Sequence, residues 1–250
     1  TADLLPTDIV GITSYEAEKG FFVIKGPIFS NFVLADEVNR APPKVQSALL
    51  EAMQEKQATI GKETFEMDLP FFVLATQNPI ETLGVYTLPE AQIDRFLFKV
   101  LMEYPKKEEE KKIIEQNITL KKFQDYKINS ILSPARILEL QDITKKISHS
   151  DKIKEYIVDI ADSTRNPEKY KIKTGKYIGL GTSPRACISM FIGAKADALL
   201  KGDSYIRPQH VKNVAYDVLR HRILLNYAGQ AEGIKTEAII KEILSKVPIP

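Results

Sequence analysis

Two short apolar runs, each ending in polar side chains, constrain the fold of this chain more than any other feature. Residues 31–35 (NFVLA) lead directly into Asp36 and Glu37, and residues 70–79 (PFFVLATQNP) end in polar residues that include Asn78. A strand that is apolar throughout and then turns polar is typical of a parallel sheet that is covered on both faces. Ligands of such sheets bind at the carboxyl ends of the strands. The sequence therefore predicts an α/β fold whose functional edge carries these side chains.

The first 105 residues alternate predicted strands with a predicted helix. Apolar runs at residues 20–24 and 95–103 are further strand candidates. Residues 42–57 place their apolar side chains on one helical stripe, and they open with two prolines, which suit the first turn of a helix. Two alternating arms at residues 57–68 surround a Gly-Lys pair, which is typical of a β-hairpin. We expect residues 1–105 to form one α/β domain.

The character of the sequence changes after residue 105. The charged run YPKKEEEKK at residues 104–112 favours a solvated linker or helix face. Predicted helices follow at residues 133–148, 151–165, 183–200, 207–224 and 235–246. Residues 106–250 are therefore expected to form a small, all-helical second domain.

Charge and cysteine content exclude several classes of protein. The chain has 35 Lys and Arg against 33 Asp and Glu, so its net charge is +2 and neither nucleic acid nor a membrane is an expected partner. Its one cysteine, Cys187, cannot form an intramolecular disulfide, which fits a reducing compartment and a cytoplasmic location. No apolar run reaches the ~20 residues that span a bilayer. The histidines lack the spacing of metal ligands.

Asp36 and Glu37 are the residue types that nucleotide hydrolysis requires. An apolar strand followed by Asp-Glu is the signature called Walker B, in which the Asp holds Mg²⁺ and the Glu polarises the attacking water. Asn78, at the end of a neighbouring strand, could orient that water without competing for the metal. The structural alternatives are an acid that caps the next helix and a turn asparagine before a proline.

Two arginines are candidates for binding phosphate. Arg95 lies between an acid and an apolar run, and a guanidinium can hold a phosphate through two hydrogen bonds. Arg185 follows Pro184 at a predicted helix start, where the helix dipole does not favour a cation, so its position points to an external anion. The alternatives are a surface salt bridge for Arg95 and a solvated side chain for Arg185.

Together, and in this order, these stretches resemble the MoxR family of AAA+ ATPases. The segments that carry the resemblance are GPIFSNFVLADEVNRAPPKVQSALLEAMQE, VLATQNPIE, LPEAQIDRFLFKV, GTSPRA and VLRHRILLNY. The resemblance implies a P-loop NTPase fold with a parallel-sheet AAA+ core and a helical lid. It also implies that Asp36 and Glu37 are the Walker B pair, Asn78 is sensor 1, Arg95 is the arginine finger and Arg185 is sensor 2.

The resemblance further implies a phosphate loop, cofactors and partners. The Gly-rich loop ending in Gly-Lys-Ser/Thr does not occur in residues 1–250, so we expect it to precede Thr1 and expect this stretch alone to hydrolyse ATP negligibly. An insertion in helix 2 would lie at residues 13–27. The implied cofactors are ATP or ADP and Mg²⁺. The implied partners are other copies in a homo-oligomeric ring, expected to be a hexamer, and a client protein, for which one with a von Willebrand A-type domain is a candidate.

Three functions stay open at this point. The first is an ATPase that couples hydrolysis to chaperone-like remodelling or maturation of a partner complex. The second is a non-hydrolysing assembly or binding module, because the phosphate loop is absent from these residues. The third is a related AAA+ motor, such as a magnesium-chelatase subunit or a DNA helicase. The near-neutral charge argues against the helicase, and the phrases LADEVNRAPPKVQSALLEAMQE and ATQNPIE favour MoxR over the chelatase.

Overall fold

Two hydrophobic clusters organise the chain, one in each half of the sequence. The computed structural model describes residues 5–78, 84–117 and 128–250. The first cluster draws its buried side chains from residues 10–88 and the second from residues 147–247. Each half therefore packs around a core of its own, and the exact domain boundary after residue 105 stays a prediction.

The two apolar runs form a parallel pair of strands, as predicted. Strand β3 (Phe32–Ala35) lies beside β6 (Phe72–Ala75), in register along their whole length. Within the described residues, no other strands pair in parallel. Both strands end at the same edge, and the residues that follow them, Asp36 and Thr76, lie side by side.

Described residues cover only one face of this pair, so the predicted burial on both faces is wrong for this part of the chain. Val33 and Val73 pack against the first cluster, whereas Leu34 and Leu74 are exposed. Side chains alternate between the two faces of a strand. An apolar run predicts the strand, but it does not determine how many of its faces are covered.

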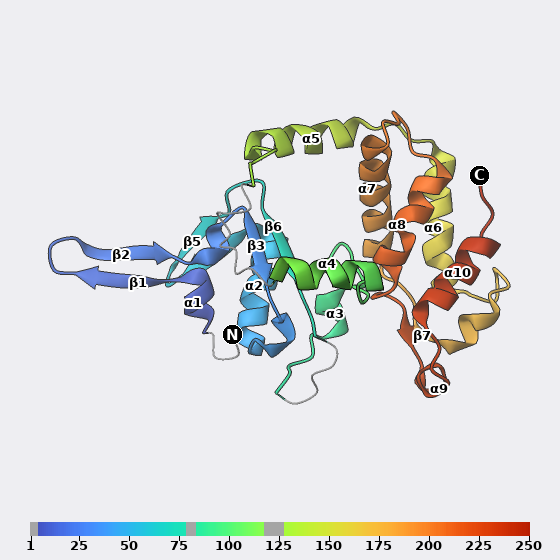
Figure 1. Cartoon of the computed structure of the whole chain (residues 1–250), viewed down its shortest axis with the longest axis horizontal. Coiled ribbons are helices and arrows are strands. Elements are labelled where there is room, and N and C mark those ends of the chain that lie inside the picture. Colours follow the sequence, from blue (N-terminus) through green and yellow to red (C-terminus); the bar gives the residue numbers. More distant parts are fainter. Residues whose placement is uncertain (1–4, 79–83, 118–127) are drawn as a thin grey trace.

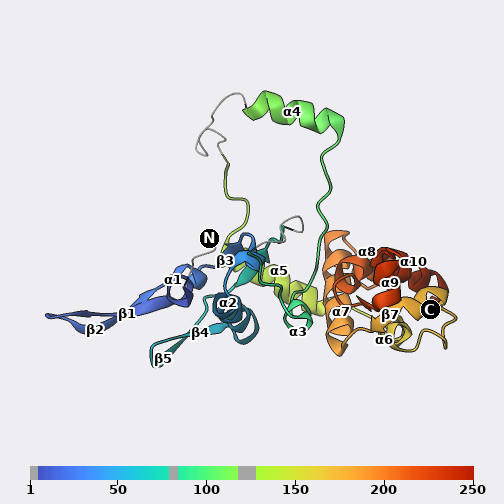
Figure 2. The same ribbon diagram turned by 90° about the horizontal axis from the view of Figure 1, so that it is seen from below.

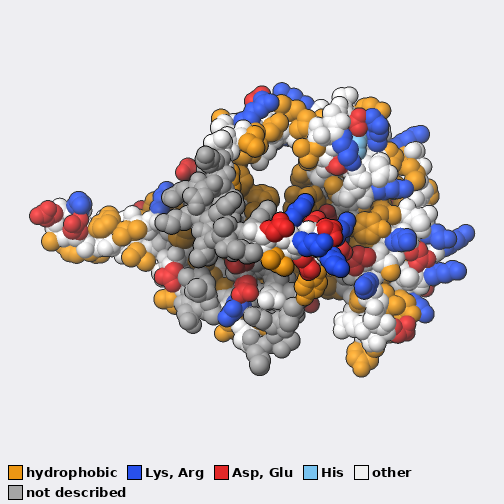
Figure 3. Space-filling view, viewed as in Figure 1, with side chains coloured by type: hydrophobic (Ala, Val, Ile, Leu, Met, Phe, Trp, Pro, Cys, Tyr) orange, Lys and Arg blue, Asp and Glu red, His pale blue; other side chains and the backbone are white. Residues whose placement is uncertain are grey.

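Strands β1 (Gly11–Glu16) and β2 (Gly20–Lys25) form an antiparallel hairpin that extends away from the first cluster (Figure 1). The predicted strand within β2 is confirmed, but it pairs with β1 and not with the parallel strands. Only glycine fits at Gly11, where α1 (Pro6–Val10) leads into the hairpin, because its φ is +115° and a Cβ would lie 2.2 Å from the Ile24 carbonyl oxygen. Exposed apolar side chains cover much of the hairpin (Figure 3), including Ile12, Tyr15, Phe21 and Ile24.

The predicted helix and hairpin between the parallel strands are both confirmed. Helix α2 (Pro43–Glu55) buries Leu49 and Leu50 in the first cluster. Strands β4 (Gln57–Ile60) and β5 (Glu63–Glu66) then pair antiparallel around the Gly-Lys turn. This helix contributes Leu49 and Leu50 to the same cluster against which Val33 and Val73 pack.

The strand predicted at residues 95–103 is wrong. The segment follows the short helix α3 (Glu90–Ile93) and binds to the C-terminal helices, with the Lys99 N–H donating to the Asp217 carbonyl at 2.8 Å. The apolar side chains that suggested a strand are exposed: Val100, Leu101 and Met102. Backbone pairing with a helix end has replaced pairing in a sheet.

Helices enclose the second cluster, as predicted. They are α6 (Asp151–Arg165), α7 (Pro184–Leu200), α8 (Pro208–Leu219) and α10 (Thr236–Lys246). The helix predicted at 207–224 ends earlier, at Leu219, because the chain turns to pair β8 (Leu224–Leu225) with β7 (Ile178–Leu180). A two-stranded ribbon thus joins an otherwise helical unit.

Serine caps fix where several of these helices begin. Ser183 accepts a hydrogen bond from the Arg185 N–H, and Pro184 occupies the first helical position of α7. The remaining elements are α4 (Lys107–Asn117), α5 (Pro134–Lys146), α9 (Tyr227–Ala231) and the 3-10 turns Pro27–Phe29, Val38–Arg40 and Lys173–Tyr177. Helix α4 stands apart from both clusters (Figure 2). The cap places Arg185 at the first turn of α7, as predicted.

Candidate functional site

A threonine joins the ends of the two parallel strands. The Thr76 hydroxyl donates to Asp36 Oδ1 at 2.5 Å and accepts a hydrogen bond from the Glu37 N–H at 2.8 Å. Backbone bonds continue the ladder past the strands, from Thr76 N–H to the Ala35 carbonyl and from Val38 N–H to the Thr76 carbonyl, both at 3.0 Å. Asp36 is thereby fixed in place through one carboxylate oxygen. Its second oxygen forms no hydrogen bond with a described residue.

Glu37 has a left-handed backbone, with φ of 48° and ψ of 51°. Such a conformation is costly for a residue with a Cβ and is concentrated at functional sites. The Glu37 carboxylate accepts from Arg40 at 2.9 Å through Oε2 and from the Asn78 amide at 3.5 Å through Oε1. The turn therefore directs Glu37 toward Asn78, which brings together two of the predicted site residues.

Buried amides support this edge from behind. Gln46 of α2 is 2% exposed, and its side-chain N–H group donates to the carbonyls of Val38 and Tyr86 at 3.1 and 3.0 Å. The Asn39 amide donates to the Asn78 carbonyl at 3.3 Å, while Asn39 Oδ1 is buried and has no hydrogen-bond partner among the described residues. The turn after Glu37 is thus tied both to the helix and to the segment after β6.

Arg95 lies elsewhere, at the end of α3. Its exposed side chain lines a shallow recess between α3 and α2. The other residues that line this recess are Gln92 and, from α2, Ser47, Leu50, Glu51, Gln54 and Glu55. Within the described part of the chain it forms no ion pair. No hydrogen bond or ion pair among these residues links Arg95 to Asp36 or Glu37.

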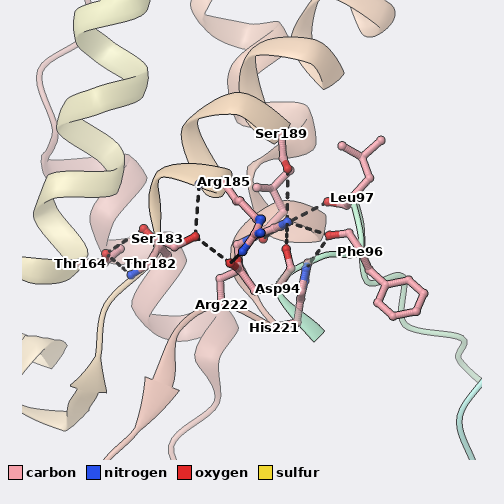
Figure 4. A network of polar contacts seen from close by, with 11 residues as sticks. Asp94, Phe96, Leu97, Thr164, Thr182, Ser183, Arg185, Ser189, His221 and Arg222 are labelled. Atoms are coloured by element: carbon pink, nitrogen blue, oxygen red, sulfur yellow. Dashed lines mark hydrogen bonds and ion pairs between the residues drawn. The ribbon is translucent and has the colours of Figure 1, made fainter. Parts of the chain in front are cut away.

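Arg185 has an anionic partner within its own chain. Its guanidinium donates to Asp94 Oδ2 at 3.2 Å, and Ser183 and Arg222 donate to the same carboxylate (Figure 4). Burial alone would raise the pKa of Asp94, but the hydrogen bonds from Ser183, Arg185 and Arg222 and the charge of Arg222 lower it below its usual value. In this structure a carboxylate of the same chain therefore holds the guanidinium, and binding of an external anion by Arg185 stays a prediction.

The predicted residues thus fall into two places. Asp36, Glu37 and Asn78 meet at the edge of the parallel strands, whereas Arg95 and Arg185 flank Asp94 at the contact between the two halves. Sequence reasoning missed the residues that hold these groups: Thr76, Asn39, Gln46, Asp94 and Arg222. A polar Gln within the buried stripe of α2 was a usable signal, but the other pairings depend on tertiary contacts.

The described residues contain neither a clustered metal site nor a membrane-spanning helix. These residues contain no group of three or more His, Cys, Asp or Glu side chains that could hold a metal ion by itself. None of their helices is both long and apolar enough to cross a membrane. Cys187 is half-buried against the second cluster, and burial raises the pKa of its thiol.

Comparison with known proteins agrees with this geometry. Residues 1–98 match the ATPase family associated with various cellular activities (AAA), and residues 173–243 match the AAA lid domain. A crystal structure of a candidate ATPase from Cytophaga hutchinsonii superposes with a TM-score of 0.91 at 48% identity, over 99% of this chain and 75% of that one. The fold and both halves therefore define an AAA+ ATPase core with its helical lid, as predicted.

Two relatives show to which family of AAA+ ATPases the chain belongs. The chain is 45% identical over 253 residues to chaperone MoxR1 of Mycobacterium tuberculosis, and 41% identical over 251 residues to the uncharacterised protein YeaC of Bacillus subtilis. All of this chain is aligned in both comparisons, and it spans 66% of the length of MoxR1 and 75% of that of YeaC. The chain belongs to the MoxR family of AAA+ ATPases.

Proposed function

We propose that this protein binds ATP with Mg²⁺, hydrolyses it, and uses the cycle for chaperone-like remodelling of a partner protein. The observation that carries the proposal is the Asp36–Glu37 pair, held at the end of parallel strands by Thr76 and placed beside Asn78. Family membership supports nucleotide chemistry, and the relative named chaperone MoxR1 supports a protein client.

The donor set fits a magnesium ion. Mg²⁺ in nucleotide sites usually takes one or two carboxylates and completes its shell with water and phosphate oxygens. Asp36 offers one carboxylate oxygen that no described residue occupies, while Thr76 holds the other. Asp36 would hold the ion. When bound, Mg²⁺ neutralises charge on the phosphates and makes the terminal phosphorus more open to attack.

Glu37 is positioned to accept the proton of an attacking water. Arg40 and Asn78 bind its two carboxylate oxygens, so the carboxylate does not rotate freely. Asn78 can bind the same water through its amide, because an amide both donates and accepts hydrogen bonds. Glu37 therefore acts as general base, and Asn78 orients the nucleophile.

Arg95 serves a nucleotide bound by a neighbouring copy in a homo-oligomeric ring. Its side chain is exposed, and no described contact links it to Glu37 of its own chain. Arg185 binds nucleotide phosphate after exchanging its bond to Asp94. We further propose that the ring is a hexamer and that its client has a von Willebrand A-type domain. The proposal also includes a cytoplasmic location and a domain boundary after residue 105.

The direct test is phosphate release from ATP by the natural protein, measured with and without Mg²⁺. Release that requires Mg²⁺ and the Glu37 carboxylate supports the proposal. Nucleotide binding without release would instead identify a non-hydrolysing assembly module.

A further inference from the structure

One buried arginine of the lid binds the backbone on both sides of Arg95. Arg222, whose side chain is 1% exposed, follows α8 and faces the turn after α3 (Figure 4). Its Nη2 donates to the carbonyls of Asp94 and Phe96 at 3.0 and 2.7 Å, and its Nη1 donates to that of Leu97 at 3.2 Å. The carbonyl groups of the residues on both sides of Arg95 are therefore hydrogen-bonded to the lid.

The same guanidinium also binds the side chain next to Arg95. Arg222 Nε donates to Asp94 Oδ1 at 2.9 Å, and Ser183 donates to Oδ2 at 2.8 Å. The Asp94 side chain is only 16% exposed. Removing the carboxylate partner of a buried guanidinium is strongly destabilising. The ion pair between Asp94 and Arg222 therefore holds both side chains in place.

The residues after Arg95 also contact the lid. His221 lies 3.2 Å from the Phe96 carbonyl through Nε2, and the ring of Phe98 packs where a Cβ on Gly193 of α7 would come within 2.9 Å of it. The Arg95 side chain, in contrast, lines the recess opposite α2 of the core. Arg95 therefore projects over the core from a backbone segment that packs on the first cluster through Ile93 and Phe96 and is hydrogen-bonded to the lid through Arg222.

We propose that Asp94 and Arg222 are positioning residues for Arg95, so that the lid sets where this arginine points. The inference rests on the proposed function, in which Arg95 completes the site of a neighbouring copy. Neither residue contacts nucleotide in this role. Motion of the lid passes to Arg95, because Arg222 binds the carbonyls of the two residues next to it.

Complementation in mixed oligomers tests this role. We expect Asp94→Asn to lower turnover by about 100-fold without weakening nucleotide binding, because a small misplacement of a catalytic group has a cost of that order. Mixed with Glu37→Gln, this variant should regain activity, since its intact Glu37 meets a correctly held Arg95 from the other subunit. Mixed with Arg95→Ala it should stay inactive, because no interface then contains a correctly held Arg95.

Arg222→Lys provides a second variant that keeps a positive charge beside Asp94 but loses the forked donors to the flanking carbonyls. Like Asp94→Asn, it should regain activity when mixed with Glu37→Gln and stay inactive when mixed with Arg95→Ala. Thermal melting shows whether each variant is folded. Asp162→Asn is the matched control, because Asp162 is a lid carboxylate that binds Lys169 and Tyr170 away from this contact. Its turnover should equal that of the unsubstituted protein.

The results separate this inference from the proposed function. Failure of Arg95→Ala and Glu37→Gln to restore each other, in oligomers shown to be mixed, overturns the shared site and the inference with it. If that pair recovers but neither folded Asp94→Asn nor folded Arg222→Lys recovers with Glu37→Gln, the shared site stands and the positioning role is wrong. Full activity of both variants alone would also overturn the positioning role.

Discussion

Thr76 Oγ1 lies 2.5 Å from Asp36 Oδ1, and this bond crosses between the ends of two parallel strands. The same hydroxyl accepts from the Glu37 N–H, so one side chain sets the positions of both acids. The contact explains how a short, partly exposed strand pair can hold a carboxylate in one orientation.

Replacement of Thr76 by Val should weaken Mg²⁺-dependent nucleotide binding by about tenfold, because one hydrogen bond to a charged group is lost. Valine keeps the branched shape but leaves Asp36 without its donor and the Glu37 N–H without its acceptor. Titration with a fluorescent ATP analogue, with and without Mg²⁺, measures the effect. Thr76→Ser retains the hydroxyl and should bind normally. Equal affinity of the Val and Ser variants would show that Thr76 does not position Asp36.

Loss of the Arg185 charge should weaken nucleotide binding but leave the fold almost as stable. Its ion pair with Asp94 is 48% exposed on the arginine side, and such pairs contribute less than about 1 kcal/mol. We expect Arg185→Gln to raise the Kd for ATP about tenfold, as for one lost charge-assisted hydrogen bond. Arg136→Gln, which removes an exposed arginine paired with Glu139, is the control. Unchanged affinity in Arg185→Gln would restrict Arg185 to its bond with Asp94.

Acid should destabilise the contact between lid and core through His221. Burial, and then the charge of Arg222, lower the pKa of His221 from 6.5 to about 4. Between these values the unfolded chain binds the proton more tightly than the folded one. The contribution of His221 to the free energy of unfolding should therefore be fully present above pH ~6.5. The free energy of unfolding should fall by up to about 3 kcal/mol as the pH approaches ~4.

Urea unfolding of the natural protein at several pH values in this window tests the effect. His221→Gln can still donate to the Phe96 carbonyl, so it should remove this part of the pH dependence while keeping the hydrogen bond. His149→Gln, at an exposed histidine, is the matched control and should leave the profile as it is. An identical acid profile for His221→Gln and the unsubstituted protein would contradict the assignment.

The sequence alone was sufficient to predict that three side chains at the strand ends lie close together. Asp36, Glu37 and Asn78 each follow an apolar run, and parallel strands end at the same edge, so their proximity follows from the pattern. The helix starts were predictable for a similar local reason, since Ser183 and Pro184 are strong N-terminal signals.

Long-range pairings could not be predicted in this way. Asp94 and Arg222 are 128 residues apart, and nothing in either local pattern identifies the other as its partner. The apolar run after Arg95 resembles a strand because it is apolar, but its backbone bonds to the lid instead. The left-handed turn at Glu37 likewise depends on Thr76 and Gln46, which belong to other elements.

Replacing Glu37 by Gln tests most directly whether this carboxylate activates the attacking water. Glutamine fills the same space, yet its amide is a far poorer proton acceptor than a carboxylate. In the natural protein with Mg²⁺ and ATP, we predict unchanged nucleotide affinity and a loss of phosphate release of about 100-fold or more, the usual contribution of a general base. Phosphate release by Glu37→Gln at the rate of the unsubstituted protein would contradict the claim that Glu37 activates the attacking water.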